Sequence, residues 1–228
     1  MKVSAIVVAA GTGSRMKSDV KKTYMEIAGV PLIIRTLRAL EESSLIKEIV
    51  LVVGEEDLDD AKSLMDQYGI RRVIRYAAGG PERQDSVRNG LQAVDDSVEL
   101  VLVHDGARPF INAAEIDRVI QSAAEYGAAT IGTPVKDTIK KVENGFVAET
   151  IPRQALYAVQ TPQAFQAKLL RESHKKASES GYRSTDDASL VEWTGHSVRI
   201  VEGSYRNIKI TTPEDLIIAE AFLRSPQA

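Results

Sequence analysis

A basic loop near the start of the chain has residue types suited to binding phosphate. Residues 9–16, AAGTGSRM, follow an apolar run, and residues 11–22 contain four basic side chains and one acid. The local charge is therefore +3 in a chain whose net charge is −3. Glycines let backbone N–H groups approach an anion closely, so this glycine loop is a candidate cradle for a polyphosphate. The alternative is an ordinary strand-to-helix turn with a solvated basic face.

The spacing in this loop excludes two familiar nucleotide-binding motifs. A dinucleotide fingerprint needs a third glycine at position 16, where the chain has Met16. A P-loop needs Gly-Lys-Ser/Thr at positions 16–18, and the chain has Met16-Lys17-Ser18. A nicotinamide-dependent dehydrogenase is therefore disfavoured.

Further candidates lie where an apolar, strand-like segment ends. Residues 100–104, LVLVH, are followed by Asp105, Gly106 and Arg108. Open α/β sheets bind ligands beyond the carboxyl ends of their strands. An acid, a glycine and an arginine there could meet a magnesium-bound phosphate and a second anion, with Asp105 as the candidate metal ligand. The alternative is a capped turn with a surface salt bridge.

Three more positions combine polar chemistry with an apolar setting. Residues 79–86, GGPERQDS, form a second glycine loop, which either presents backbone groups and the Ser86 hydroxyl to a base or is a plain loop. His104 is expected to be a packed histidine rather than a ligand. Lys209 interrupts the apolar segment 207–211, which indicates either a charge that protects an edge strand or a charge directed into the site.

The elements that would position these residues alternate between strands and helices. The first apolar runs are almost continuous, as strands buried on both faces must be. Pro31 opens one amphipathic segment at the first helical position, Gly69 ends another, and Asn112 with Glu115 forms a capping box before a third. The pattern predicts an α/β fold with a doubly wound, mostly parallel, Rossmann-like sheet. The predicted strands cover residues 3–10, 47–54, 99–104, 128–132, 197–201 and 205–210. The predicted helices are one that Pro31 opens, residues 55–68, one that bears Val87, Leu91 and Val94, residues 112–127, residues 185–195 and a last segment capped by Thr212.

One stretch breaks the alternation. In residues 136–150 the dipeptide Asn144-Gly145 separates two strand-like segments. This dipeptide favours a tight hairpin, because both turn residues tolerate positive φ. We expect a hairpin over about residues 133–155, inserted in a single domain of residues 1–228. A surface flap and a dimerisation arm are both compatible with this pattern.

Composition limits the class of protein. The 228 residues are 43% hydrophobic and 27% charged, which is ordinary for a globular chain. A net charge of −3 argues against a general nucleic-acid binder. There is no cysteine, and the three histidines are far apart in sequence, which argues against a zinc site. The apolar runs are too short for a membrane span, and no signal-peptide pattern is present, so a cytoplasmic location is expected.

Seven motifs, in order along the chain, carry a resemblance to a known family. They are AAGTGSRM followed by KKTY, GGPERQDSV, VLVHDGARPF, PVKDTIK, AVQTPQAF, STDDAS and NIKITTPEDL, and they run from residue 9 to residue 216. Together they resemble the sugar-phosphate nucleotidyltransferases and, within these, the 2-C-methyl-D-erythritol 4-phosphate cytidylyltransferases of the non-mevalonate isoprenoid pathway. Lys21 departs from the pattern, because the family often has proline there.

The resemblance implies transfer of a cytidylyl group from CTP to a sugar-alcohol phosphate, with release of pyrophosphate and with Mg²⁺ as cofactor. It also implies a homodimer in which the hairpin arm crosses to the partner and places Thr138 and Arg153 in the partner's active site. By position, Arg15 and Lys22 would stabilise charge on the triphosphate, and Arg153 and Lys209 would hold the acceptor phosphate. The positions implied to contact CTP are Ala9, Ala10, Gly11, Gly13, Gly80, Arg83 and Ser86, and those implied to lie near the acceptor are Asp105, Gly106, Arg108, Thr138, Thr161, Thr185 and Thr211.

Two other functions compete with this interpretation. A cytidylyltransferase for ribitol 5-phosphate shares the glycine loop, but the segments Asp105–Arg108 and TDDAS favour the methylerythritol enzyme. A non-catalytic nucleotide-binding regulator on the same fold is a different class. The presence of Arg15, Lys22, Asp105 and Lys209 together argues against that class.

Overall fold

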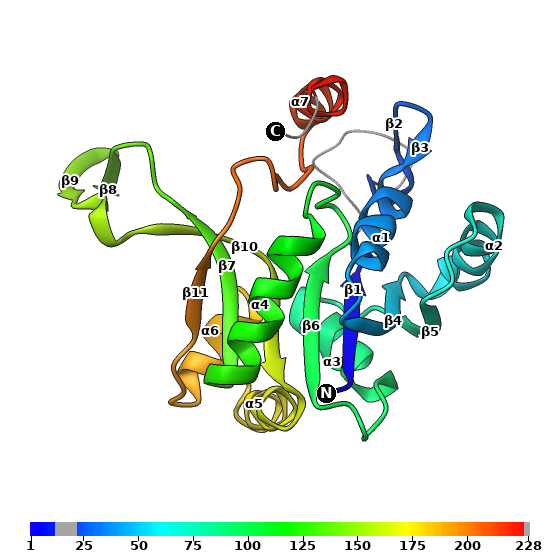
Figure 1. Cartoon of the computed structure of the whole chain (residues 1–228). Helices are drawn as coiled ribbons and strands as arrows, with labels where there is room; N and C mark the ends of the chain where they lie inside the picture. The colour runs from blue at the N-terminus through cyan, green and yellow to red at the C-terminus, as the bar shows by residue number, and fades with distance from the viewer. Residues whose placement is uncertain (12–21, 226–228) are drawn as a thin grey trace.

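The computed structural model describes residues 1–11 and 22–225, and its centre is a sheet of seven strands (Figure 1). The strand order is β11-β7-β10-β6-β1-β4-β5. Every neighbouring pair is parallel except the two pairs that β10 makes with β6 and β7. The predicted mostly parallel sheet is therefore confirmed. The strands are β1 (Val3–Val8), β4 (Ile46–Val53), β5 (Val73–Ala78), β6 (Leu100–Asp105), β7 (Ala128–Pro134), β10 (Tyr157–Gln166) and β11 (Arg199–Glu202).

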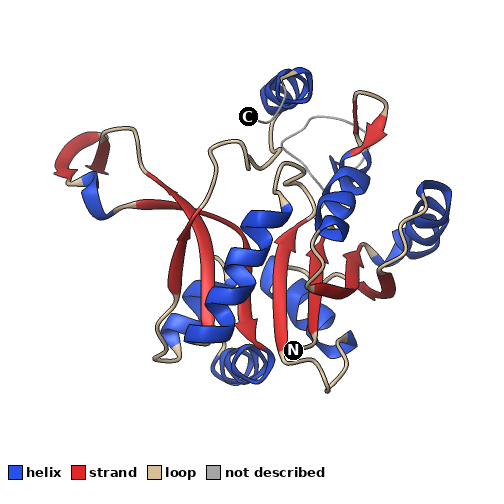
Figure 2. Ribbon diagram, in the orientation of Figure 1, coloured by secondary structure: helices blue, strands red, loops and turns tan. Residues whose placement is uncertain are grey.

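Helices cover both faces of this sheet (Figure 2). Successive side chains of a strand point to opposite faces, so in β1 Ala5 and Val7 join one apolar core while Ile6 joins the other. Both layers bury almost all of their apolar side chains, which explains why the central strands have nearly continuous apolar sequences. The first layer contains α1 (Leu32–Glu42), α2 (Leu58–Tyr68) and α4 (Ala113–Tyr126), and the second contains α3 (Arg83–Ala93), α5 (Ala167–Ser180) and α6 (Asp187–Trp193).

A third, smaller apolar cluster lies beyond the carboxyl ends of the strands. It includes Ile27 of β2, Phe110 and Ile210, and the last helix packs on it through Ala219 and Phe222. This cluster attaches the C-terminal part of the chain to the edge of the sheet where ligands of α/β proteins bind. The elements here are η2 (Lys22–Tyr24), β2 (Glu26–Ile27), β3 (Val30–Pro31) and α7 (Pro213–Arg224), and a further short helix, η3 (Glu55–Asp57), precedes α2.

Most of the predicted helix boundaries are confirmed. The Asn112 side chain accepts a hydrogen bond from Glu115 N at 2.9 Å and completes a capping box at the start of α4. Gly69 ends α2 with φ of 69°. Pro31 is the N-cap of α1 rather than its first residue. The predicted strand at residues 205–210 is wrong, because this segment crosses above the strand ends and directs its polar groups to the loops there.

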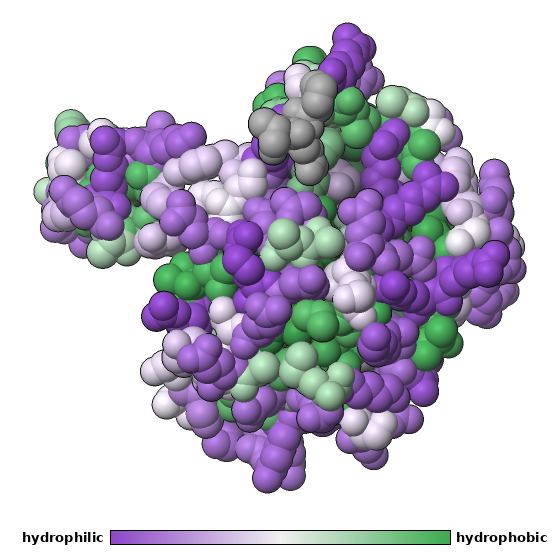
Figure 3. Space-filling model, in the orientation of Figure 1, coloured by the Kyte–Doolittle hydropathy of each residue, from purple (hydrophilic) through white to green (hydrophobic). Residues whose placement is uncertain are grey.

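The predicted hairpin is present and stands away from the body. Strands β8 (Ile139–Glu143) and β9 (Phe146–Ile151) pair with each other only, and Asn144 and Gly145 turn the chain with φ of 51° and 84°. A short helix, η4 (Arg153–Ala155), leads back to β10. We call residues 135–156, between β7 and β10, the arm. It forms a separate lobe of the molecular surface (Figure 3). No helix of the described chain is long and apolar enough to cross a membrane.

Candidate active site

The centre of the candidate site is Asp105, the last residue of β6. Its side chain is 8% exposed and contacts three basic groups. Arg83 Nε lies 3.2 Å from Oδ1, Lys209 Nζ lies 2.7 Å from Oδ2, and Arg108 Nε lies 3.7 Å from Oδ2. We call Asp105 and these three side chains the Asp105 cluster.

The electrostatics of this cluster favour the charged forms of Asp105 and Arg83. Burial would raise the pKa of Asp105, but Arg83 and Lys209 outweigh this effect and hold that pKa well below its ordinary value. Burial likewise opposes the charge of Arg83, yet Asp187 and Asp105 raise the pKa of its guanidinium. Burial lowers the pKa of Arg108. Three cations face the two carboxylates, so the cluster together with Asp187 has a net charge of +1.

Gly106 brings the Asp105 cluster against the end of β1. Its N–H donates to Val8 O at 2.9 Å. A Cβ at this position would lie 2.9 Å from Ile33 Cδ1 and 3.1 Å from Ala9 Cβ, closer than packed carbon atoms lie. A side chain here would have to displace Ile33 or Ala9, so the glycine lets the residue after Asp105 pack closely against Ala9, where the glycine loop begins.

His104 and Thr161 lock the loop that carries Asp105. The Arg108 carbonyl lies 3.1 Å from His104 Nε2 and can only accept, so Nε2 donates to it and Nδ1 must accept. The Thr161 hydroxyl, 3.2 Å from Nδ1, donates to it and accepts from Asp105 N at 3.0 Å. Burial lowers the pKa of His104 to about 4, in keeping with a neutral ring. The expectation of a packed histidine is confirmed.

The second glycine loop approaches the first one closely. A Cβ on Gly79 would lie 2.2 Å from Ala10 Cβ, so the two loops touch at this glycine. The Ser86 side chain accepts from Gly80 N at 3.0 Å and donates to Glu82 O at 3.1 Å, and the residue is 3% exposed. In this structure the Ser86 hydroxyl therefore holds the loop together.

The segment that carries Lys209 is joined to the Asp105 loop by several bonds. Ile210 N donates to Ala107 O at 2.9 Å, and Arg108 Nη1 donates to Asn207 O at 2.8 Å. Asn207 is fully buried, and its amide donates to Thr161 O at 2.9 Å. Lys209 is therefore directed at Asp105, and its interpretation as a guard of an edge strand is wrong.

Several implied residues lie apart from the Asp105 cluster. Thr138 and Arg153 lie on the arm, where Arg153 Nη1 donates to Lys136 O. Thr185 is exposed just before α6. The Thr211 hydroxyl donates to Asp215 Oδ2 at 2.9 Å, in the first turn of α7. Gly13 and Arg15 lie outside the described residues, and so does the side chain of Lys22.

Two buried residues of the site were not singled out from the sequence. Asp187, at the start of α6, bonds Arg83 at 2.7 Å, and His174 of α5 bonds Asp187 at 3.2 Å. Asp187 belongs to the motif STDDAS, where its acidic type was a usable signal. His174 follows an amphipathic helical pattern and offers no such signal.

Comparison with known proteins agrees with this geometry. The sequence profile of the 2-C-methyl-D-erythritol 4-phosphate cytidylyltransferases (IspD) matches residues 3–225. The chain belongs to this family. The cytidylyltransferase of this name from Geobacillus thermodenitrificans is 51% identical over 225 residues, covering 99% of this chain and 98% of the relative. The one from Pelotomaculum thermopropionicum is 49% identical over 229 residues, covering 99% and 96%.

Solved structures of family members have the same fold. The 4-diphosphocytidyl-2C-methyl-D-erythritol synthase of Anaerococcus prevotii superposes with a TM-score of 0.88 at 36% identity, covering 98% of this chain and 96% of that one. The cytidylyltransferase of Thermus thermophilus gives a TM-score of 0.80 at 35% identity, covering 96% and 98%. The family match thus extends over the sheet, both helical layers and the region of the arm.

Proposed function

We propose that this chain transfers the cytidylyl group of CTP to 2-C-methyl-D-erythritol 4-phosphate. An oxygen of the acceptor phosphate forms a bond to the α-phosphorus of CTP, and the bond from that phosphorus to the oxygen leading to the β-phosphorus breaks. Pyrophosphate leaves with the electron pair, and the product is 4-diphosphocytidyl-2-C-methyl-D-erythritol. The observation that carries the proposal is the Asp105 cluster, which gathers three cations at the carboxyl edge of the sheet beside the glycine loop.

The Asp105 cluster has the chemistry that the acceptor phosphate requires. Lys209 is 35% exposed and Arg108 is 11% exposed, so an anion can reach the lysine while the arginine supports it from within. A phosphate is already ionised at neutral pH and needs no general base. His104 is not available as a base, because both of its ring nitrogens are engaged. Catalysis would then consist of positioning and charge neutralisation.

The nucleotide would lie against the two glycine loops. Ala9, Ala10 and Gly11 leave β1 at the sheet edge, and Gly80 lies on the neighbouring loop. Arg83 follows that loop, but its Nε and Nη1 are bonded to Asp105 and Asp187, so in our proposal it acts within the Asp105 cluster. Arg15 and Lys22 of the glycine loop would neutralise the triphosphate as charge moves to the leaving pyrophosphate. Gly13 would allow close approach of the backbone to that group.

Nucleotidyltransferases generally use a divalent cation, but the described side chains do not fit an ion held by the protein alone. Within the described part of the chain, no group of three or more histidine and acidic side chains could hold a metal. The oxygens of Asp105 already contact Arg83, Arg108 and Lys209, which a metal would have to displace. Asp105 therefore has no metal-dependent step in our proposal. We propose that the expected Mg²⁺ enters the site bound to CTP, since Mg²⁺ commonly binds substrate phosphates.

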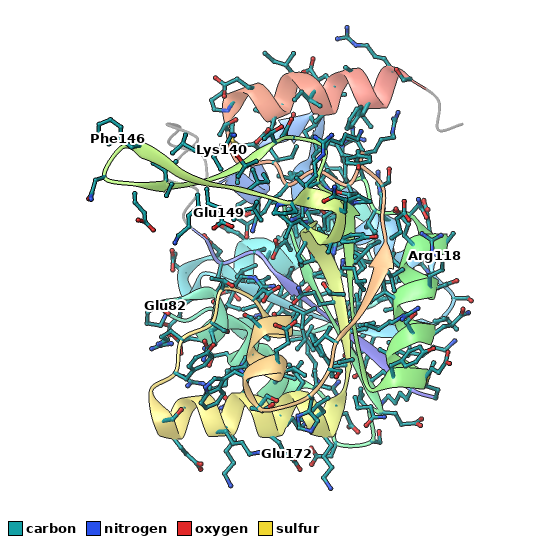
Figure 4. The ribbon with its side chains drawn as sticks, turned by 90° about the vertical axis from the view of Figure 1, so that its left-hand side faces the viewer. Glu82, Arg118, Lys140, Phe146, Glu149 and Glu172 are labelled. Atoms are coloured by element: carbon teal, nitrogen blue, oxygen red, sulfur yellow. The ribbon has the colours of Figure 1, made fainter. Side chains whose placement is uncertain are left out.

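The proposed assembly is a homodimer joined through the arm. The arm exposes apolar side chains, with Val142 at 57%, Phe146 at 79% and Val147 at 61% exposed. Figure 4 shows Phe146 at the tip, with Lys140 and Glu149 further back along the arm. A two-stranded hairpin is marginally stable alone in water, so these side chains favour contact with a second copy of the chain. Thr138 and Arg153 would then complete the partner's site.

Release of pyrophosphate tests the proposed reaction. The purified chain is mixed with CTP and Mg²⁺, and 2-C-methyl-D-erythritol 4-phosphate is compared with ribitol 5-phosphate at equal concentration. Fast release with the methylerythritol acceptor alone supports the proposal. Release with ribitol 5-phosphate alone would keep the mechanism and overturn the acceptor, and no release with either would refute both.

A further inference from the structure

Arg83 connects two carboxylates that belong to different parts of the fold. Its Nε donates to Asp105 Oδ1 at 3.2 Å, and its Nη1 donates to Asp187 Oδ2 at 2.7 Å. The side chains of the two acids are 8% and 2% exposed. Arg83 lies at the start of α3, Asp105 at the end of β6 and Asp187 at the start of α6. The guanidinium therefore fixes the relative position of three elements around the site.

Asp187 is itself held on its second oxygen. His174 Nε2 lies 3.2 Å from Asp187 Oδ1, and His174 is 3% exposed. A carboxylate only accepts hydrogen bonds, so His174 donates from Nε2. Burial would raise the pKa of Asp187, but Arg83 and His174 outweigh it and hold that pKa below its ordinary value. Each oxygen of Asp187 thus has one donor, which fixes the rotation of the carboxylate.

The same division of oxygens occurs at Asp105. Arg83 bonds Oδ1, while Lys209 and Arg108 face Oδ2. If Arg83 is free to turn, the carboxylate of Asp105 loses the bond that fixes its plane. Lys209, whose only described ion pair is with Asp105, then loses its fixed direction as well. A continuous chain of bonds therefore runs from His174 through Asp187, Arg83 and Asp105 to Lys209.

From this chain of bonds we infer that Asp187, oriented by His174, is a positioning residue for the acceptor phosphate. It acts through Arg83 on Asp105 and so on the cations of the Asp105 cluster, and it does not itself touch substrate. This inference rests on the proposed function, in which Lys209 and Arg108 bind the acceptor. It predicts that a change at Asp187 alters the use of the acceptor more than the use of CTP.

Glu48 supplies a matched control. It is a buried acid, 5% exposed, that pairs with Lys2 and Arg75. It lies near the start of β4, whereas ligands bind beyond the carboxyl ends of the strands. Glu48→Ala therefore removes a buried, paired carboxylate, as Asp187→Ala does, but leaves the chain of bonds from His174 to Lys209 intact.

The test compares Asp187→Ala, Asp187→Asn and Glu48→Ala with the wild type. For each protein, kcat and KM are measured separately for CTP and for 2-C-methyl-D-erythritol 4-phosphate, together with the urea midpoint. Asp187→Ala is expected to raise the acceptor KM about tenfold, within the range of coupling through side-chain networks. The acceptor KM of Asp187→Asn should stay within about threefold of the wild-type value, because an amide oxygen can still accept a hydrogen bond from Arg83. Glu48→Ala should lower the urea midpoint and leave both KM values unchanged.

Each other outcome overturns the inference. If folded Asp187→Ala has the wild-type KM for the acceptor, Asp187 has only a structural role. A rise confined to the KM for CTP would show that Asp187 affects binding of the nucleotide rather than of the acceptor. An Asp187→Asn variant as impaired as Asp187→Ala would show that the charge of Asp187, and not its positioning of Arg83, is required. If Asp187→Ala does not fold, His174→Phe and His174→Gln are compared in its place, with a raised acceptor KM expected only for the phenylalanine. Wild-type and Glu48→Ala proteins that are both inactive would instead refute the proposed function.

Discussion

A mixture of two inactive variants would test whether each active site is shared between two chains. Arg153 lies on the arm, where it bonds Lys136 of the same arm, whereas Lys209 lies in the body against Asp105. In the proposed dimer, one site uses Lys209 of its own chain and Arg153 of the partner subunit. Arg153→Ala and Lys209→Ala therefore change residues that the two different chains contribute to one site.

The expected recovery follows from this arrangement. Each variant alone loses one phosphate-binding cation from both sites, which should lower the rate by roughly 10²–10³-fold. After random exchange of subunits, about half of the dimers contain one chain of each kind. In such a hybrid, both substitutions fall in one site and the other site is intact. The mixture should then recover about a quarter of the wild-type rate, far above either variant.

The assay is pyrophosphate release after the two proteins are mixed and exchange is verified with a mass-labelled chain. Lys209→Ala mixed with Arg108→Ala is the control, because both residues belong to the same chain's cluster and no intact site can form. Verified exchange without recovery in the first mixture would show that Arg153 and Lys209 do not meet across the dimer, and the proposed role of the arm would be abandoned.

Three further outcomes are expected. Lys22→Ala or Arg15→Ala should lower turnover by roughly 10²–10³-fold, and full activity in a folded variant would remove that residue from the mechanism. Asp105→Asn should raise the acceptor KM while the half-saturating Mg²⁺ concentration stays constant, and a shift of roughly tenfold or more in that concentration would identify Asp105 as a metal ligand. Burial lowers the pKa of His104 to about 4, whereas an unfolded histidine titrates near pH 6.5, so the unfolded state binds a proton that the folded state does not. The free energy of unfolding should fall by about 3 kcal/mol from this group as the pH drops from about 6.5 to about 4. His104→Gln should remove that part of the fall in urea titrations, and identical pH profiles for both proteins would contradict the assignment.

Local chemistry accounts for the parts of the fold that were predictable. The Asn144-Gly145 turn and the capping box of Asn112 depend on a few adjacent residues, and both are present. Strand β10 and helix α5 have no counterpart among the predicted elements. In β10, Pro162 interrupts the apolar pattern, and the pairing with β7 shifts register between Val159 and Gln163. A proline in a strand is tolerated at such an irregularity. The local sequence pattern does not predict where the register shifts.

The residues of the candidate site likewise fall into two groups: those that could be predicted from adjacent sequence and those that depend on contacts formed in the fold. Asp105 and Arg108 were recognisable because they leave a buried strand at the edge where ligands bind. The strand predicted around Lys209 is absent, because the backbone there bonds to the Asp105 loop instead of extending the sheet. Asp187 joins the candidate site through its bond with Arg83, and His174 joins it through its bond with Asp187; both bonds form only after folding.

The Asp105 cluster also bears on how the chain acquires activity. The bonds of Arg83 close long segments of chain, because Asp105 lies 22 positions and Asp187 lies 104 positions further along the sequence. Contacts between residues so distant in sequence carry a large loop-closure entropy and tend to form slowly. Secondary structure and collapse should therefore recover before turnover in a refolding experiment. If Lys209 holds the acceptor phosphate as we propose, a nascent chain that ends before this residue should be inactive even when most of its sheet has folded.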